Sequence, residues 1–138
     1  MISLPIRYAY VACPYTCKVP SVEDMRAEIA AAASAILWEA QGVVPFNVIG
    51  HGRSFEAFLS AKPTHANWMF LDLAFLGALA AGCARGSLQV VIVAAPGWAA
   101  SAGVQQEIDA ARALGIEAVV DHELYAQALA RVQQKAAA

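Results

Sequence analysis

The stretch from Val90 to Leu114, VVIVAAPGWAASAGVQQEIDAARAL, constrains the fold more than any other part of the chain. It begins with a run of Val, Ile and Ala that is long enough for one buried strand, and Pro96 and Gly97 interrupt that run. Apolar residues then recur at helical spacing, at Val104, Ile108, Ala111 and Leu114. The stretch therefore predicts a strand, a loop and a helix in succession.

Residues with small side chains mark both ends of this predicted helix. Ser101 is suited to cap its beginning, because a serine hydroxyl can accept a hydrogen bond from an amide of the first turn. Gly115 follows the last apolar position, where helices commonly end in a left-handed residue. The loop lies at the carboxyl end of a strand, where open α/β sheets bind ligands, and the helix start offers amides to an anion. Glu107 follows Ser101 by less than two turns, so both side chains can face one cleft.

The chain before this stretch predicts two further strands and two helices. We expect a strand over residues 7–13, a helix that Ser21 and Asp24 begin and Gly42 ends, and a strand over 43–46. Residues 47–67 are polar and irregular, with a short helix expected over 55–60. A segment this long without a pattern is often functional. The helix over 68–84, closed by Gly86, is apolar nearly all round and should be buried.

A strand over residues 116–120 and a helix over 122–135 complete the chain. Because strands alternate with helices throughout, the sequence predicts an α/β fold, a three-layer sandwich with a mostly parallel sheet of four to five strands. The length of 138 residues is enough for one domain, taken as residues 1–138. The order of the strands remains open at this point.

Composition limits the partners of the chain. Charged residues make up 14% and apolar residues 59%, so we expect an apolar face buried between subunits of a homodimer or homotetramer. The net charge of −2 with no basic block argues against nucleic acid. The start, MISLPIRYAYV, is unlike a signal peptide, and the longest apolar run, Leu73–Ala84, is too short to span a membrane. A cytoplasmic protein is therefore expected.

Three cysteines fit a reducing compartment. Cys13 and Cys17 are the only close pair, and they lack a second pair of ligands at zinc spacing, so no metal and no cofactor are expected.

Three motifs resemble the nucleoside 2-deoxyribosyltransferase-like superfamily, within it a bacterial branch of uncharacterised domains. They are YVACPYT near the start, NWMFLDLAFL in the middle and, most specifically, PGWAASAGVQQEIDAA. The resemblance covers nearly the whole chain and implies a flavodoxin-like fold, with dimers or tetramers whose sites lie near subunit contacts. Members usually carry an acidic residue at the start of the central strand, whereas Ser87–Val90 here contains none.

The resemblance also implies roles for individual residues. Glu107 would be the nucleophile that attacks the anomeric carbon of the sugar, and Asp72 the second acidic group. Ser101 and Gly103 would bind the 5′ end of the sugar, and Tyr10 would lie at the pocket floor. Two further residues of the motifs, Cys13 and Trp98, are candidate substrate contacts, with packing as the favoured alternative for Trp98.

The chemistry of these residue types supports the same function. Two carboxyl groups can cleave a glycosidic bond, one capturing the anomeric carbon and the other protonating the leaving group. The alternatives are an exposed helix position for Glu107, a buried polar residue bonded to a loop amide for Asp72, and a simple cap for Ser101. Arg53 is the basic residue that the sequence places best to meet a phosphate, although a solvated loop is the default for it and for His65.

The sequence thus predicts cleavage or transfer of the N-glycosidic bond of a nucleoside or nucleoside 5′-monophosphate. A phosphate is favoured because enzymes of the superfamily that act on unphosphorylated nucleosides typically have an acid where this chain has Ser101. The alternatives are a nucleotide-sensing module of the same fold and an oligomeric scaffold without a ligand.

Overall fold

The sheet of the protein has four strands, all parallel, in the order β2-β1-β3-β4. A computed structural model describes residues 6–138, so the first residues of the stretch compared with a signal peptide lie outside the described part. The strands are β1 (Tyr8–Ala12), β2 (Val44–Asn47), β3 (Leu88–Val93) and β4 (Glu117–Asp121). This order matches the first four strands of the flavodoxin-like arrangement, so the predicted fold class is confirmed.

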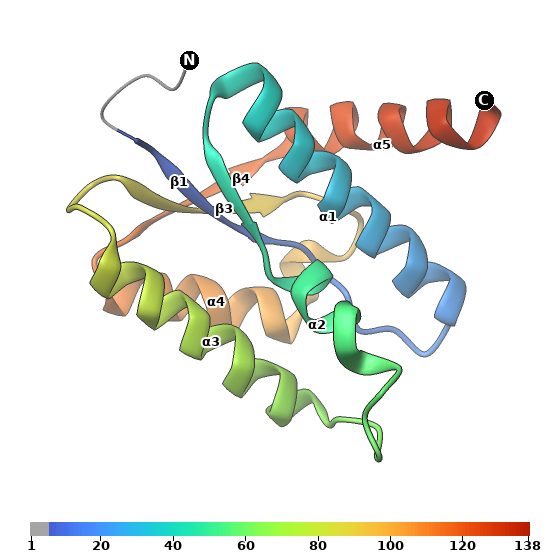
Figure 1. The fold of residues 1–138 in the computed structure, drawn as a ribbon, viewed down its shortest axis with the longest axis horizontal. Helices are drawn as coiled ribbons and strands as arrows, with labels where there is room; N and C mark the ends of the chain where they lie inside the picture. Colours follow the sequence, from blue (N-terminus) through green and yellow to red (C-terminus); the bar gives the residue numbers. More distant parts are fainter. Residues whose placement is uncertain (1–5) are drawn as a thin grey trace.

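Helices cover both faces of the sheet (Figure 1). One face carries α1 (Pro20–Gln41) and α5 (His122–Ala137), and the other carries α3 (His65–Gly82) and α4 (Ala102–Ala113). The short helix α2 (Val48–Glu56) continues directly from β2, and a 3₁₀ turn, η1 (Trp98–Ala100), precedes α4. The sandwich therefore has three layers, as the alternation of elements predicted.

Alternate residues of the central strands enter the two cores. From β1, Ala9 and Val11 join the core beneath α1 and α5, whereas Tyr10 and Ala12 join the core beneath α3 and α4. Tyr10 is fully buried, and Tyr8, two residues earlier on the same face of the strand, packs against the same core.

The stretch over 90–114 folds as its pattern predicts, into β3, η1 and α4. Ser101 caps α4, since its hydroxyl accepts a hydrogen bond from the amide of Val104 at 3.3 Å. Gly115 follows the helix with φ +72°, in the left-handed region that favours glycine.

The predicted beginning of α1 is wrong. The helix begins at Pro20, and neither Ser21 nor Asp24 caps it. Proline is favoured at the first helical position, because its missing N–H has no partner there and its φ is already helical. Gly42, with φ +64°, ends the helix as predicted.

The prediction of an irregular segment over residues 47–67 is also wrong. Asn47 caps α2 by accepting the amide hydrogen of Gly50 at 3.1 Å, so the helix starts well before the expected 55–60. Gly50 and Gly52 disfavour a helix in a sequence pattern, which is why α2 was missed. Thr64 and Asn67 form a capping box that starts α3, and α3 ends at Gly82 before the predicted Gly86.

Helix α3 is less buried than its all-round apolar pattern predicted. Met69 and Leu76 are buried, but Phe70 is 79% exposed.

Within residues 6–138, no helix combines the length and the apolar character needed to cross a bilayer.

Candidate functional site

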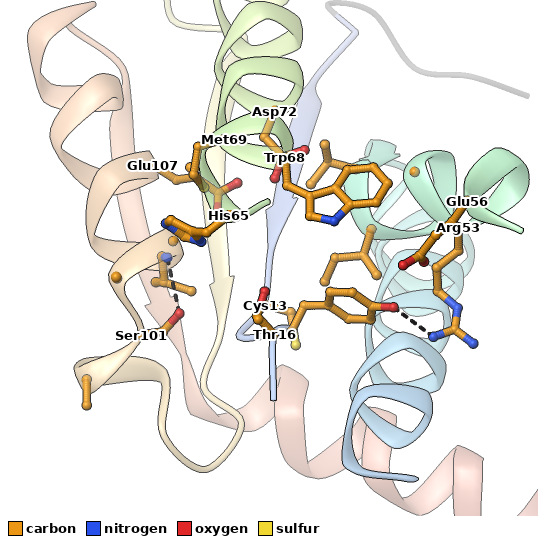
Figure 2. A pocket seen from close by; sticks show the side chains of 18 residues that line it. Cys13, Thr16, Arg53, Glu56, His65, Trp68, Met69, Asp72, Ser101 and Glu107 are labelled. Carbon is orange, nitrogen blue, oxygen red and sulfur yellow. Dashed lines mark hydrogen bonds between the residues drawn. The ribbon is translucent and has the colours of Figure 1, made fainter. Parts of the chain in front are cut away.

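A cavity of about 370 Å³ opens at the carboxyl ends of β1 and β3. The chain leaves these two neighbouring strands toward opposite edges of the sheet, and open α/β sheets bind ligands at such a switch point. Residues of the loop after β1, of α2, of α3 and of the start of α4 line the cavity (Figure 2). Its volume lies within the range of sites for small molecules.

The start of α4 forms one wall, where Ser101, Gly103 and Glu107 line the cavity. Gly103 keeps a narrow space free of side-chain atoms, because a Cβ built there would already contact Met69 Sδ at 3.4 Å and His65 Cε1 at 3.7 Å. The amides of the first turn of α4 also lie at this end, where a helix attracts an anion. We call the space over Gly103, bounded by Ser101, Met69 and His65, the glycine corner.

Glu107 is 4% exposed, and it is the charged residue that is buried within the described part of the chain. Its Oε2 atom has no hydrogen-bond partner among residues 6–138. Burial raises the pKa of Glu107 to about 8; hydrogen bonding to the Tyr10 hydroxyl lowers this pKa and the charge of Asp72 raises it further. A buried carboxyl with an unpartnered oxygen toward a cavity is typical of a functional group rather than of packing.

Asp72 lines the same cavity from α3, and burial raises its pKa to about 6. Tyr10 lies below the cavity floor and its hydroxyl donates a long hydrogen bond, 3.4 Å, to the Asp72 carbonyl. Burial, and then the charge of Glu107, raise the pKa of Tyr10 far above its ordinary value, so the phenol keeps its proton. The structure thus places two carboxyl groups and one hydroxyl donor together.

Helix α2 and the loop after β1 form the opposite wall. Arg53 lines the cavity, but its Nη1 donates to the Tyr15 hydroxyl at 2.9 Å and its Nη2 pairs with Asp24 at 2.9 Å. Glu56 and Trp68 line this side as well. Arg53 is therefore at the cavity, as predicted, but its guanidinium is already bound to the protein.

Cys13 lines the cavity from the end of β1, and burial raises the pKa of its thiol to about 12, so the sulfur stays protonated. Trp98 does not line the cavity; it packs on the core beneath α3 and α4, with its ring 6.3 Å from that of His122. The structure therefore brings together every predicted site residue except Trp98, with Tyr10 just below the others.

The sequence did not single out Glu56, and it placed Trp68 in a buried helix and His65 in a solvated loop. On α3, His65, Met69 and Asp72 recur at helical spacing and face the cavity together, a periodicity that could have been read from Asp72 backwards. Glu56 carried no such signal, because α2 itself was not predicted.

Among residues 6–138, no group of three or more His, Cys, Asp and Glu side chains is placed to hold a metal ion.

Comparison with known proteins gives one family. The family model described as "Domain of unknown function (DUF1937)" matches residues 7–123, which span every strand and all helices up to the start of α5. No curated protein matches the chain.

Proposed function

The chain belongs to the DUF1937 family, a domain of unknown function, and we propose that its cavity cleaves or transfers the N-glycosidic bond of a nucleoside or nucleoside 5′-monophosphate. One observation carries this proposal: Glu107 and Asp72 line the same cavity, and the buried Glu107 Oε2 has no partner within residues 6–138. A module that only senses a nucleotide would need the glycine corner but not two carboxyl groups with raised pKa values.

In the proposed reaction, a Glu107 oxygen forms a bond to the anomeric carbon of the sugar. The bond from that carbon to the base nitrogen breaks, its electron pair stays on the base, and Asp72 donates a proton to it. Water or a second base then attacks the same carbon, releases Glu107 as a carboxylate and returns a proton to Asp72. Tyr10 supports Glu107 from below, since its hydroxyl lowers the pKa of Glu107 and so favours the ionised carboxylate.

The two carboxyl groups are close enough to titrate as a pair, and their pKa values of about 6 and about 8 leave one shared proton near neutral pH. These pKa values place the single proton mostly on Glu107, so the reaction uses the less populated one-proton form, in which Glu107 is ionised and Asp72 is protonated. We expect a bell-shaped dependence of kcat/KM on pH, with limbs near 6 and 8. Below the lower limb the nucleophile is protonated, and above the upper limb the acid has lost its proton. A rate that rises monotonically from pH 5 to 9 would contradict this assignment.

The glycine corner supports a phosphorylated substrate. Ser101 contributes a hydroxyl without charge, the first turn of α4 contributes amides, and His65 lies beside them on α3. His65 replaces Arg53 as the basic residue closest to this corner, because Arg53 lies on the opposite wall and is bound to Asp24. We therefore propose that the 5′-phosphate of the substrate binds at the glycine corner.

The direct test is incubation with nucleosides and nucleoside 5′-monophosphates while free base is measured. We expect base release by the wild type and a loss of at least about a thousandfold in Glu107→Gln, which keeps the shape of the side chain but cannot attack. The matched control is Asp109→Asn, on the same helix at an exposed position outside the cavity. Binding without release of any base favours the sensing module, and equal rates in wild type and Glu107→Gln exclude Glu107 as nucleophile.

We also propose that the protein is a cytoplasmic homodimer or homotetramer. The three cysteines are free, which suits a reducing compartment, and Phe70 on α3 leaves a large apolar side chain exposed in the single chain. Light scattering at micromolar concentration tests the assembly; a monomer contradicts it.

A further inference from the structure

The residues of the cavity lie in an order that matches the parts of a nucleotide. In Figure 2, Ser101, His65 and Glu107 lie on one side, Trp68 lies past Asp72, and Glu56 and Arg53 lie on the far side. Helix α3 packs between α4 and α2, so the two ends of the cavity are separate. If the sugar lies at the carboxyl groups and its 5′ end at α4, the base extends toward α2.

Trp68 is held in place at this far side. A Cβ on Gly52 would lie only 3.0 Å from Trp68 Cζ3, so the indole rests closely against the backbone of α2 and any side chain at residue 52 would press on it. The ring of Phe55 lies 6.1 Å from the indole at 48°. A half-buried indole that is fixed from behind and lines the cavity in front is a platform on which a planar base can stack.

Tyr15 supplies a second fixed ring on the same side. Its hydroxyl accepts a hydrogen bond from Arg53, whose guanidinium carbon lies 5.8 Å from the ring centroid and whose other nitrogen is held by Asp24. Tyr15 therefore loses little freedom when a ligand binds beside it.

Glu56 is the charged side chain of this wall that remains available. Within residues 6–138 its carboxylate makes no hydrogen bond and no ion pair, although Arg53 lies one turn before it on α2. Arg53 is engaged by Asp24 and Tyr15 instead. An ionised carboxylate only accepts hydrogen bonds, so it favours N–H groups on a ligand and repels carbonyl oxygens.

We propose that Trp68, Tyr15 and Glu56 form the base subsite of the cavity, and that Glu56 makes it selective for bases with an exocyclic amino group. This inference rests on the proposed function, because the direction of the base follows from the sugar at Glu107 and Asp72. It adds the class of base, which the carboxyl pair alone leaves open.

The test measures binding rather than turnover, in protein that carries Glu107→Gln throughout. Two pairs of purine nucleosides differ only by an amino group: adenosine against purine riboside, and guanosine against inosine. We expect the amino-bearing member of at least one pair to bind about tenfold more tightly, the effect of one charge-assisted hydrogen bond. Adding Glu56→Gln should reduce that ratio to about threefold or less, because the neutral amide accepts a weaker hydrogen bond. Adding Asp109→Asn should leave it unchanged.

Stacking has its own readout. Binding should quench tryptophan fluorescence in the parent protein, and Trp68→Phe should remove most of that quenching, although Trp38 and Trp98 remain. The inference is overturned if neither pair differs in affinity, if Glu56→Gln leaves the ratio unchanged, or if no nucleoside binds. In the first two cases base release by the wild type can persist, so this failure is distinct from failure of the proposed reaction.

Discussion

The two faces of the sheet are packed alike but differ in where they place polar groups. Beneath α1 and α5 the buried cluster is apolar, and the ion pairs of these helices lie outside it, between Arg131 and Glu39 at 2.8 Å and between Lys135 and Glu28 at 3.9 Å. Beneath α3 and α4, an equally closed core borders a cavity that contains Glu107. One face therefore contributes stability alone, whereas the other gives up some stability to hold carboxyl groups away from water.

Truncation of matched leucines should separate the two faces most strongly. Leu124 on α5 and Leu76 on α3 are 1% and 0% exposed. Replacing either with Ala should lower the free energy of unfolding by about 2–5 kcal/mol, because each change leaves a cavity in a closed core. Leu76→Ala should also lower kcat of the folded protein, since Leu76 lies one turn after Asp72, whereas Leu124→Ala should not. Denaturant titration and activity at low temperature measure both effects; equal losses of kcat would remove the distinction between the faces.

The free energy of unfolding of Glu107→Gln should exceed that of the wild type by an amount that grows as pH rises. The folded state raises the pKa of Glu107 from 4.5 to about 8, so it holds the proton more tightly than the unfolded chain does. The wild type therefore loses stability between these two pH values, and the glutamine variant does not. We expect a difference near zero at pH 4 that grows to a few kcal/mol at pH 8. A difference that does not depend on pH, measured by urea unfolding across this range, would show that burial does not perturb this carboxyl.

Gly103→Ala should strengthen the fold slightly while it blocks the glycine corner. Gly103 lies in the first turn of α4 without a positive φ, so alanine should add about 0.5–1 kcal/mol of stability. The new methyl group would contact Met69 and His65 and fill the proposed phosphate position. Affinity for a nucleoside 5′-monophosphate should fall at least about tenfold, and that for the bare nucleoside much less. Equal losses of affinity for both ligands would show that the phosphate does not bind at the glycine corner.

The smallest effect is expected at the Arg53–Asp24 pair, which is exposed. Asp24→Asn should change the free energy of unfolding by less than about 1 kcal/mol. If Arg53 only fixes Tyr15, nucleotide affinity should also change little. A marked gain in affinity for 5′-monophosphates would instead mean that the freed Arg53 reaches the phosphate.

Local patterns predicted the elements whose causes are local. Ser101 begins α4 through its side-chain cap, and Gly115 follows its end with a left-handed backbone conformation. Both causes are local, so α4 could be located from a short stretch of sequence. The sequence pattern did not locate helix α2, because its start depends on the Asn47 cap, against which Gly50 lies, and because Gly52 serves the packing of Trp68.

The residues of the candidate site also fall into those that local sequence predicted and those that depend on tertiary packing. The motif residues Glu107 and Ser101 carried the resemblance and proved to share a cavity. The position of Glu56 at that cavity depends on how α2 packs against α3, which periodicity within one helix does not encode. His65 and Trp68, by contrast, share a face of α3 with Asp72, and the spacing of these residues is a sequence signal. Strand order could not be predicted either, since pairing of β1 with β3 is a tertiary contact.

The pairing of β1 with β3 has a consequence for folding during translation. Tyr8 pairs with Leu88, so β1 stays without one of its two neighbours until most of the chain has been synthesised. A nascent chain that ends with α3 has β1 and β2 but an open strand edge next to Tyr10 and Val11, rich in apolar side chains. Such an edge invites pairing with other chains, and long-range parallel pairing closes slowly. We therefore expect the yield of folded protein in the cell to depend on chaperones that shield this edge during translation.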